Sequence, residues 1–186
     1  MVQPLPCSFQ IYLGKRPPYK MAEEPVAAAN EIVPGLWLGN RVAAADAEFH
    51  AEKKIQAVFN CSKDIPFEKS VPRQYRVPVD DSRQEPDIRN LELWSYEIVY
   101  KIAHEMRRAE KEGTAVLVHC AAGIQRSAAS VAMYLIATRN MTTDEAIDFI
   151  KTKRPIAFHH TANFEKSIRG FEKSFAQEVR PRLNQT

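Results

Sequence analysis

The sequence places a cysteine, a glycine and an arginine at short intervals within one segment. Gly123 follows Cys120 by three residues, and Arg126 follows it by six. An ionised thiol is a strong nucleophile, and the planar fork of an arginine binds two oxygens of a phosphate group. A glycine between them allows the chain to curl tightly. This combination indicates nucleophilic attack on a bound phosphate or a similar oxyanion.

The elements expected on either side of this segment would create an anion site. Residues 114–119 form a short apolar run that predicts a buried strand, and a helix is predicted over residues 126–139. Ligands of α/β sheets bind at such a strand-to-helix corner. Backbone N–H groups point inward there, and the helix dipole adds positive potential. We therefore expect the Cys120 pKa to lie well below the free-thiol value of about 8.5, with the Ser127 hydroxyl bonded to the thiolate.

Hydrophobic periodicity predicts how the rest of the chain is organised. Apolar runs predict strands over residues 31–33, 36–38, 56–60, 74–79 and 114–119. Helical spacing predicts helices over residues 42–54, 91–112, 126–139, 143–153 and 162–179. Thr143 is the expected N-cap of the fourth helix. Together these elements predict an α/β fold, with a central, mostly parallel sheet of about five strands flanked by helices. A phosphate-binding loop is expected between a central strand and a helix.

Composition sets broad limits on the class of protein. The 186 residues fit one ordinary domain, and 45% hydrophobic with 26% charged residues is typical of a globular protein. A net charge of +3 is too mild to predict nucleic-acid binding by itself. The longest nearly apolar run, residues 128–137, is too short to span a bilayer. Three cysteines are too few for a disulfide scaffold.

The two ends of the chain differ from the middle. Five of the twelve prolines fall within the first 25 residues, so residues 1–28 are predicted to form an extended arm. The arm carries the apolar side chains Leu5, Phe9, Ile11, Tyr12 and Leu13. We expect it to dock on the domain or on a partner, and a homodimer through the arm is one form of such docking. The domain that carries the chemistry is assigned to residues 29–176, and a C-terminal tail to residues 177–186.

One motif resembles the phosphate-binding loop of the cysteine-dependent protein tyrosine phosphatases: His119-Cys120-x-x-Gly123-x-x-Arg126-Ser127. Further segments are similar to the dual-specificity branch of that superfamily, namely residues 32–40, 55–62, 75–82, 146–155 and the helix that contains Phe164 and Ile168. The resemblance covers about residues 31–172. Because the domain is short and no separate tyrosine-bearing loop is seen, it looks like an atypical member of the small, poxvirus-H1-like branch.

The resemblance implies a role for each residue of the loop. Cys120 would attack phosphorus and form a cysteinyl-phosphate intermediate. Arg126 would bind the equatorial phosphoryl oxygens together with the backbone N–H groups of Ala121, Ala122, Gly123, Ile124 and Gln125. Ser127 would help to expel the thiolate during hydrolysis, and His119 would orient the loop and support the low pKa of Cys120.

The reaction also needs a carboxylic acid, to protonate the leaving oxygen and then to accept a proton from the attacking water. Asp80 and Asp81 are adjacent candidates. The family places the acid three residues after a proline, and Asp81 stands three residues after Pro78. Asp80 stays an alternative, because a one-residue shift of the loop would exchange the two. Cys120 follows Asp81 by 39 positions, a separation larger than the branch usually has.

The resemblance implies hydrolysis of phosphotyrosine and of phosphoserine or phosphothreonine in proteins. Two alternatives stay open: an RNA 5′-triphosphatase or polyphosphatase of the same superfamily, and a phosphate-binding interaction module without turnover. RNA-directed relatives usually carry a histidine at the position of Ala122, and an asparagine and a threonine at those of Gln125 and Ser127. The neutral side chains of the loop argue against inositol headgroups, and no DNA partner is expected.

No metal ion or organic cofactor is expected. His159 and His160 are adjacent, but no third ligand stands at a useful spacing. Cys61 closes a predicted strand and is interpreted as structural. A thiolate nucleophile needs a reducing compartment, so the mechanism implies a cytoplasmic or nuclear location.

Overall fold

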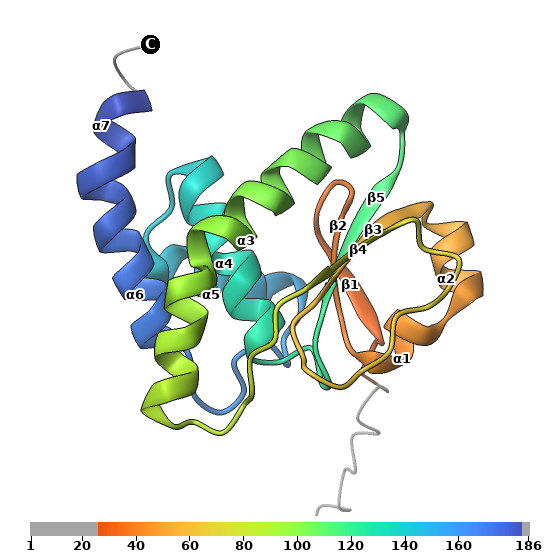
Figure 1. Cartoon of the computed structure of the whole chain (residues 1–186), viewed down its shortest axis with the longest axis horizontal. Coiled ribbons are helices and arrows are strands. Elements are labelled where there is room, and N and C mark those ends of the chain that lie inside the picture. Colours follow the sequence, from red (N-terminus) through yellow and green to blue (C-terminus); the bar gives the residue numbers. More distant parts are fainter. Residues whose placement is uncertain (1–25, 184–186) are drawn as a thin grey trace, which may run out of the picture.

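The computed structural model describes residues 26–183, which form one sheet with helices packed on it (Figure 1). Residues 1–25 and 184–186 lie outside the described part. Most of the predicted arm therefore falls outside it, and so do the expected docking and homodimer. None of the helices between residues 26 and 183 has the length and apolarity that crossing a bilayer requires.

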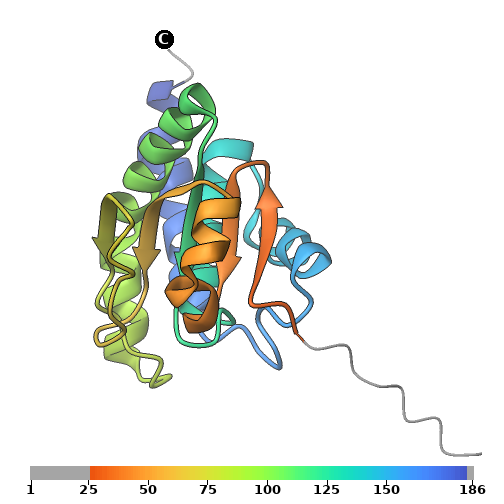
Figure 2. The same ribbon diagram turned by 90° about the vertical axis from the view of Figure 1, so that its right-hand side faces the viewer.

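Five strands form the sheet, in the order β1-β2-β5-β3-β4 (Figure 2). Their bounds are Ala29–Val33 (β1), Leu36–Gly39 (β2), Ile55–Asn60 (β3), Arg73–Arg76 (β4) and Ala115–His119 (β5). β1 and β2 pair antiparallel, and the other neighbouring pairs are parallel. This confirms the predicted α/β fold with a mostly parallel sheet.

β5 lies at the centre of the sheet and is buried on both faces. Val116 and Val118 pack into one core cluster, whereas Ala115 and Leu117 pack into a second, because side chains alternate between the faces of a strand. A short, continuous apolar run is what such a doubly buried strand requires. β2, β3 and β5 end level with one another, at the register partners Gly39, Asn60 and His119.

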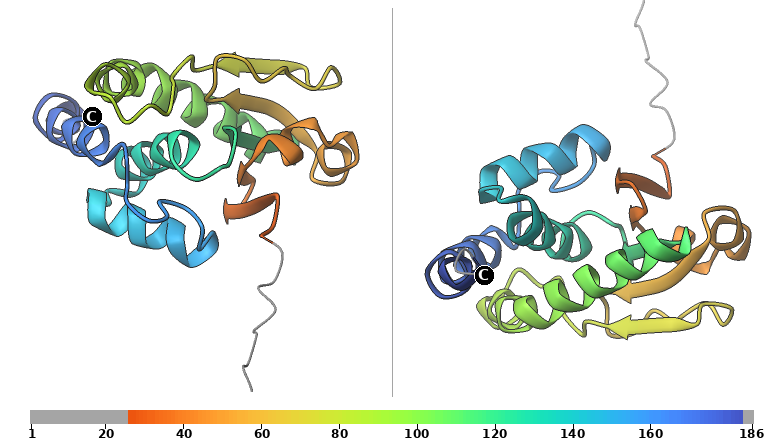
Figure 3. Two further views of the ribbon diagram at one scale, coloured as in Figure 1. Left: turned by 90° about the horizontal axis from the view of Figure 1, so that it is seen from below. Right: turned by 90° about the horizontal axis from the view of Figure 1, so that it is seen from above.

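Helices cover both faces of the sheet (Figure 3). Their bounds are Arg41–Ala45 (α1), Ala47–Glu52 (α2), Glu85–Glu112 (α3), Arg126–Arg139 (α4), Thr143–Lys153 (α5), Glu165–Ser174 (α6) and Arg180–Leu183 (α7), with a π-helical turn at Phe175–Val179. α1 and α2 lie on one face, and α3, α4, α5 and α6 lie on the other. α4 packs against the other three helices of its face and is buried over its first eleven residues.

Two local predictions are wrong, and both errors involve a capping residue. The segment predicted as one helix over residues 42–54 forms two helices, because the backbone of Asp46 is extended, with φ −90° and ψ 97°. The Asp46 carboxylate accepts a hydrogen bond from the Phe49 N–H at 3.0 Å and caps α2. The N-cap of α5 is Thr142 rather than Thr143, and it forms a reciprocal capping box with Glu145.

Three predicted boundaries also move. The strand predicted over residues 74–79 ends at Arg76. α3 begins at Glu85 rather than at residue 91, with Pro86 in its first turn, where a missing N–H costs little. The helix predicted over residues 162–179 begins at Glu165 and becomes π-helical from Phe175. Helical structure then continues to Leu183, into the predicted tail.

Candidate active site

The Cys120 side chain lies in a loop, residues 120–125, between the end of β5 and the start of α4, and it is 1% exposed. Its Sγ accepts a hydrogen bond from the Ser127 Oγ at 3.2 Å. Burial acts to raise the pKa of this thiol. The Ser127 hydroxyl, nearby backbone N–H groups and the charge of Arg126 outweigh burial and hold the pKa of Cys120 below its ordinary value.

Gly123 gives the loop its shape. Its φ of +67° lies in the left-handed region that favours glycine. A Cβ at this position would stand 2.4 Å from the Gly39 carbonyl oxygen, at the end of β2. The Arg41 N–H donates to the Ala121 carbonyl at 3.1 Å and ties the loop to the same part of the sheet. A side chain at residue 123 would therefore push the loop away from the sheet.

Arg126 begins α4 and is buried beside the cysteine loop. One end of its guanidinium is fixed, since Nη1 donates to the Val79 carbonyl at 3.1 Å. Its Nε has no hydrogen-bond partner among residues 26–183 and lies 3.8 Å from an Asp81 carboxylate oxygen. A buried donor without a partner costs free energy. A bound phosphate would supply that partner.

The two candidate acids point to different partners. Asp81 faces Arg126, and its other carboxylate oxygen accepts a hydrogen bond from the Asn163 side-chain amide at 3.3 Å. Asp80 instead pairs with Lys63, and its side chain is 50% exposed against 29% for Asp81. The geometry therefore brings Asp81, and not Asp80, toward the anion-binding arginine.

His119 is fully buried at the end of β5, and neither ring nitrogen has a hydrogen-bond partner among residues 26–183. Burial lowers the pKa of His119 to about 4, so the imidazole is neutral near pH 7. A positive charge on His119 therefore does not account for the low pKa of Cys120 near pH 7, and the support expected from this residue stays a prediction. The orienting role of the ring stays a prediction.

The buried neutral imidazole predicts a loss of stability in acid. The pKa of His119 is about 4 in the folded chain against 6.5 for an ordinary histidine, so the unfolded chain binds more protons between those values. The free energy of unfolding should fall as the pH drops from 6.5 to 4, with about 3 kcal/mol lost through this residue. Urea denaturation of the wild type and His119→Gln across this range measures it. Equal losses in both proteins would contradict the assignment.

Gln125 joins the cysteine loop to the segment that follows α5. Its side-chain amide donates to the Thr161 carbonyl at 2.7 Å and accepts from the Asn163 N–H at 2.9 Å. The Ile124 carbonyl accepts from the Phe158 N–H at 2.9 Å. The exposed pair His159 and His160 is thus held beside the site. No group of three or more His, Cys, Asp or Glu side chains in the described chain could hold a metal ion.

Cys61, the second described cysteine, follows β3 and is fully buried. Burial raises its pKa to about 12, so the thiol stays protonated near neutral pH. Its Sγ lies 3.5 Å from the Ser130 Oγ. The two described cysteines therefore differ in reactivity, although both are buried.

Two residues of the site were missed in the sequence. Asn163, which bonds Asp81, stands in a segment with no distinctive motif. Arg154 was noted only as part of a similar stretch of sequence, yet it is fully buried and bonds the cysteine loop. Arginine is rarely buried, so the sequence offers no signal for the Arg154 contact beyond the resemblance itself, and it offers none for the Asn163 contact.

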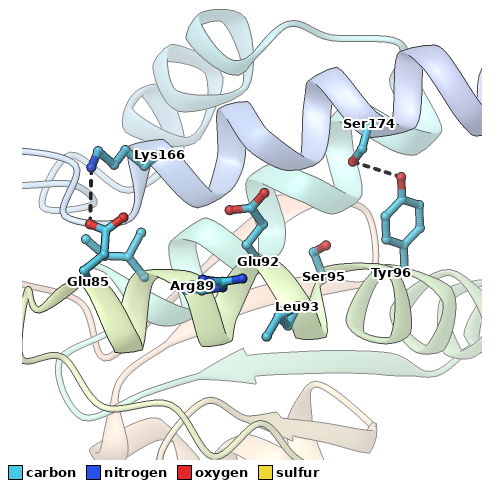
Figure 4. A pocket seen from close by; sticks show the side chains of 9 residues that line it. Glu85, Arg89, Glu92, Leu93, Ser95, Tyr96, Lys166 and Ser174 are labelled. Carbon is cyan, nitrogen blue, oxygen red and sulfur yellow. Dashed lines mark hydrogen bonds and ion pairs between the residues drawn. The ribbon is translucent and has the colours of Figure 1, made fainter.

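A cavity of about 560 Å³ lies elsewhere, between α3 and α6 (Figure 4). Two contacts between these helices border the cavity. The Lys166 Nζ lies 3.2 Å from a Glu85 carboxylate oxygen, and the Tyr96 hydroxyl donates a hydrogen bond to the Ser174 Oγ at 3.0 Å. No residue of the cysteine loop lines it. The chemistry-bearing side chains therefore do not belong to this cavity.

Comparison with known proteins matches most of the chain to one family. Residues 36–174 match the profile of the dual specificity phosphatase catalytic domain. Dual specificity protein phosphatase 16 of Homo sapiens is 32% identical over 150 residues, which are 80% of this chain and 21% of that protein. This chain thus spans about a fifth of that relative's length.

Solved structures agree. Human DUSP28 superposes with a TM-score of 0.66 at 27% identity, covering 81% of this chain and 96% of that one. A mouse putative dual specificity phosphatase, crystallised in a complex with zinc tungstate, gives 0.67 at 27% identity over 90% of this chain and 96% of that one. The matched residues include the whole cysteine loop and the segment that carries Asp81. The chain therefore belongs to the dual-specificity phosphatases of the cysteine-dependent protein tyrosine phosphatase superfamily, as an atypical member.

Proposed function

We propose that this domain hydrolyses phosphotyrosine and phosphoserine or phosphothreonine in proteins, through a cysteinyl-phosphate intermediate. One arrangement carries the proposal: the loop that holds the Cys120 thiol leads directly into Arg126, whose guanidinium is partly unpaired, and the Asp81 carboxylate faces that guanidinium. A nucleophile, an anion clamp and an acid are thus gathered at the carboxyl edge of the sheet. Membership of the family supports the same chemistry.

In the first step, the Cys120 thiolate attacks phosphorus, and an S–P bond forms as the P–O bond to the substrate breaks. Arg126 and the loop N–H groups bind the equatorial oxygens and stabilise their charge in the transition state. Protonated Asp81 gives its proton to the leaving oxygen, so the amino-acid side chain departs as a neutral hydroxyl.

In the second step, water attacks the phosphorus of the intermediate and the S–P bond breaks. The Asp81 carboxylate accepts a proton from the attacking water. The Ser127 Oγ, 3.2 Å from the Cys120 Sγ, stabilises the departing thiolate. Inorganic phosphate and the starting enzyme are the products.

The placement of the two aspartates predicts unequal effects of substitution. Asp81→Ala should lower kcat toward a phosphotyrosine peptide by about 10²-fold or more, since the leaving oxygen loses its proton donor. Asp80→Ala should change kcat only slightly, because it removes an exposed ion pair with Lys63.

A leaving-group comparison sharpens this test. The p-nitrophenolate ion leaves readily without protonation, so Asp81→Ala should reduce kcat less with p-nitrophenyl phosphate than with the peptide. Asp80→Ala is the matched control at the adjacent position. A larger effect at Asp80 than at Asp81 would show that the acid has been misassigned.

The substrate class is tested by comparing phosphotyrosine and phosphothreonine peptides with triphosphorylated RNA. We expect phosphate release from both peptides and none from the RNA. Release from RNA alone would overturn the proposal in favour of an RNA 5′-triphosphatase. Tight binding of phosphopeptides without any release would identify a phosphate-binding module.

The proposed chemistry needs Cys120 reduced and ionised, which implies the cytoplasm or nucleus as the setting. The partners of this protein are then phosphoproteins of the same compartment. The steps above use side chains and backbone N–H groups of residues 29–176, the proposed catalytic domain. Placement within the poxvirus-H1-like branch stays a prediction.

A further inference from the structure

Arg154 is a fully buried arginine at the carboxyl end of α5. A buried guanidinium is ordinarily paired with a carboxylate, because an isolated charge is expensive to take out of water. No carboxylate of residues 26–183 lies within ion-pair distance of Arg154. Burial lowers its pKa, and the charge of the Cys120 thiolate acts to raise it. The nearby anion that acts on this cation is therefore the nucleophile itself.

The guanidinium is held by neutral oxygens on two sides. Toward the cysteine loop, Nε donates to the Gly123 carbonyl at 2.9 Å, and Nη2 donates to the Ala122 carbonyl at 3.4 Å. Toward the start of β1, Nη1 donates to the Ala27 carbonyl at 2.9 Å and to the Asn30 Oδ1 at 2.7 Å. A Cβ at residue 123 would lie 2.9 Å from Nη2, so glycine also makes room for this contact.

These contacts fix the direction of two peptide groups. The carbonyl of Ala122 and the N–H of Gly123 belong to one peptide group, and in a trans peptide they point in opposite directions. Because the Ala122 carbonyl points toward Arg154, the Gly123 N–H points away from Arg154. The Gly123 N–H is one of the groups that lower the pKa of Cys120, which places it on the thiolate side. The Gly123 carbonyl and the Ile124 N–H are related in the same way.

We propose that Arg154 is a positioning residue for phosphoryl transfer: it holds the peptide groups on either side of Gly123 so that their N–H groups face the thiolate and the phosphoryl oxygens. The inference rests on the proposed function. Arg154 touches no reacting atom and acts through the loop. Its contact with Ala27 also links the loop to the point where the described chain begins.

Two measurements that need no turnover test the proposal. The pH dependence of Cys120 alkylation by iodoacetamide, followed by peptide mass spectrometry, reports the pKa of this thiol. Inhibition or binding by orthovanadate reports the affinity for a phosphate-like oxyanion. Arg154→Met should raise the pKa of Cys120 by about 1 and weaken vanadate binding by about 10²-fold. Arg169→Met, on the exposed face of α6, is the matched control and should change neither.

Arg154→Lys separates charge from geometry. Lysine keeps the cation but not the planar fork that bonds two carbonyls at once. We expect Arg154→Lys to keep the pKa of Cys120 closer to the wild-type value than Arg154→Met does, while vanadate binding stays weak. Should Arg154→Met fail to fold, Asn30→Ala loosens the guanidinium from the opposite side, and it should shift both measurements in the same direction by less.

Folded Arg154→Met with the wild-type alkylation profile and wild-type vanadate affinity would overturn the inference, as would unchanged values in Asn30→Ala when the first variant does not fold. The outcome is separable from the proposed function. A wild-type protein that binds vanadate but releases no phosphate from any phosphopeptide would remove the function and leave the positioning role standing.

Discussion

Cys120→Ser is expected to abolish hydrolysis of p-nitrophenyl phosphate, with kcat falling by at least about 10⁴-fold. The thiol is the only described one with a lowered pKa, and the loop N–H groups, Ser127 and Arg126 together stabilise its anion. A serine hydroxyl at the same place stays protonated near neutral pH, because its anion is far less stable than a thiolate. The anion site itself should survive, so vanadate binding is expected to remain measurable.

Cys61→Ser is the matched control for this result. Cys61 is equally buried, but its pKa of about 12 keeps it protonated, and the proposed reaction does not use it. The kcat of Cys61→Ser should stay within a few-fold of the wild-type value. The assay is run at a temperature where circular dichroism shows both Cys61→Ser and Cys120→Ser folded. Full activity in Cys120→Ser, or a comparable loss in Cys61→Ser, would contradict the assignment of the nucleophile.

Arg126→Lys should lower kcat/KM by about 10³-fold, even though the positive charge is retained. One end of the guanidinium is held by the Val79 carbonyl, which leaves the Nε side for the phosphoryl oxygens. A lysine ammonium cannot bond the carbonyl and two oxygens in one plane. Since these bonds are strongest when charge spreads over the transition state, kcat should fall more than the affinity for phosphate.

Arg139→Lys is the comparison for this variant, since it makes the same change at the far, exposed end of α4. Its kcat/KM should match the wild type. Arg126→Lys within tenfold of the wild type would show that charge alone suffices, and the bidentate clamp would have to be abandoned.

The centre of the fold could be predicted because the local sequence pattern and the tertiary packing favour the same elements there. β5 is a short apolar run that both faces of the sheet bury, and α4 follows it over the predicted residues. Spacing alone also placed Cys120, Gly123 and Arg126 at one strand-to-helix turn, since six residues leave the chain little choice of path. Local physical chemistry was sufficient there.

The rest depends on contacts that no local pattern encodes. Asp46 looks like one more polar residue of a helix until its carboxylate caps α2. Asp80 and Asp81 are neighbours in sequence, and only the fold shows that Asp80 pairs with Lys63 whereas Asp81 faces Arg126. Arg154 is an arginine, a residue type expected on the surface. It can be buried because carbonyl oxygens from two other segments accept its hydrogen bonds. The neutral state of His119 likewise follows chiefly from its burial in the folded chain.

The central claim is a covalent bond between phosphorus and the Cys120 sulfur, and trapping that bond tests it most directly. The Ser127→Ala variant loses the hydroxyl that stabilises the departing thiolate, so the intermediate should accumulate during turnover of a phosphotyrosine peptide. Rapid quenching in denaturant, followed by peptide mass spectrometry, locates the phosphoryl group. We predict one phosphoryl group on the peptide that contains Cys120. Turnover with no covalent phosphoryl group, or with that group on another residue, would contradict the account.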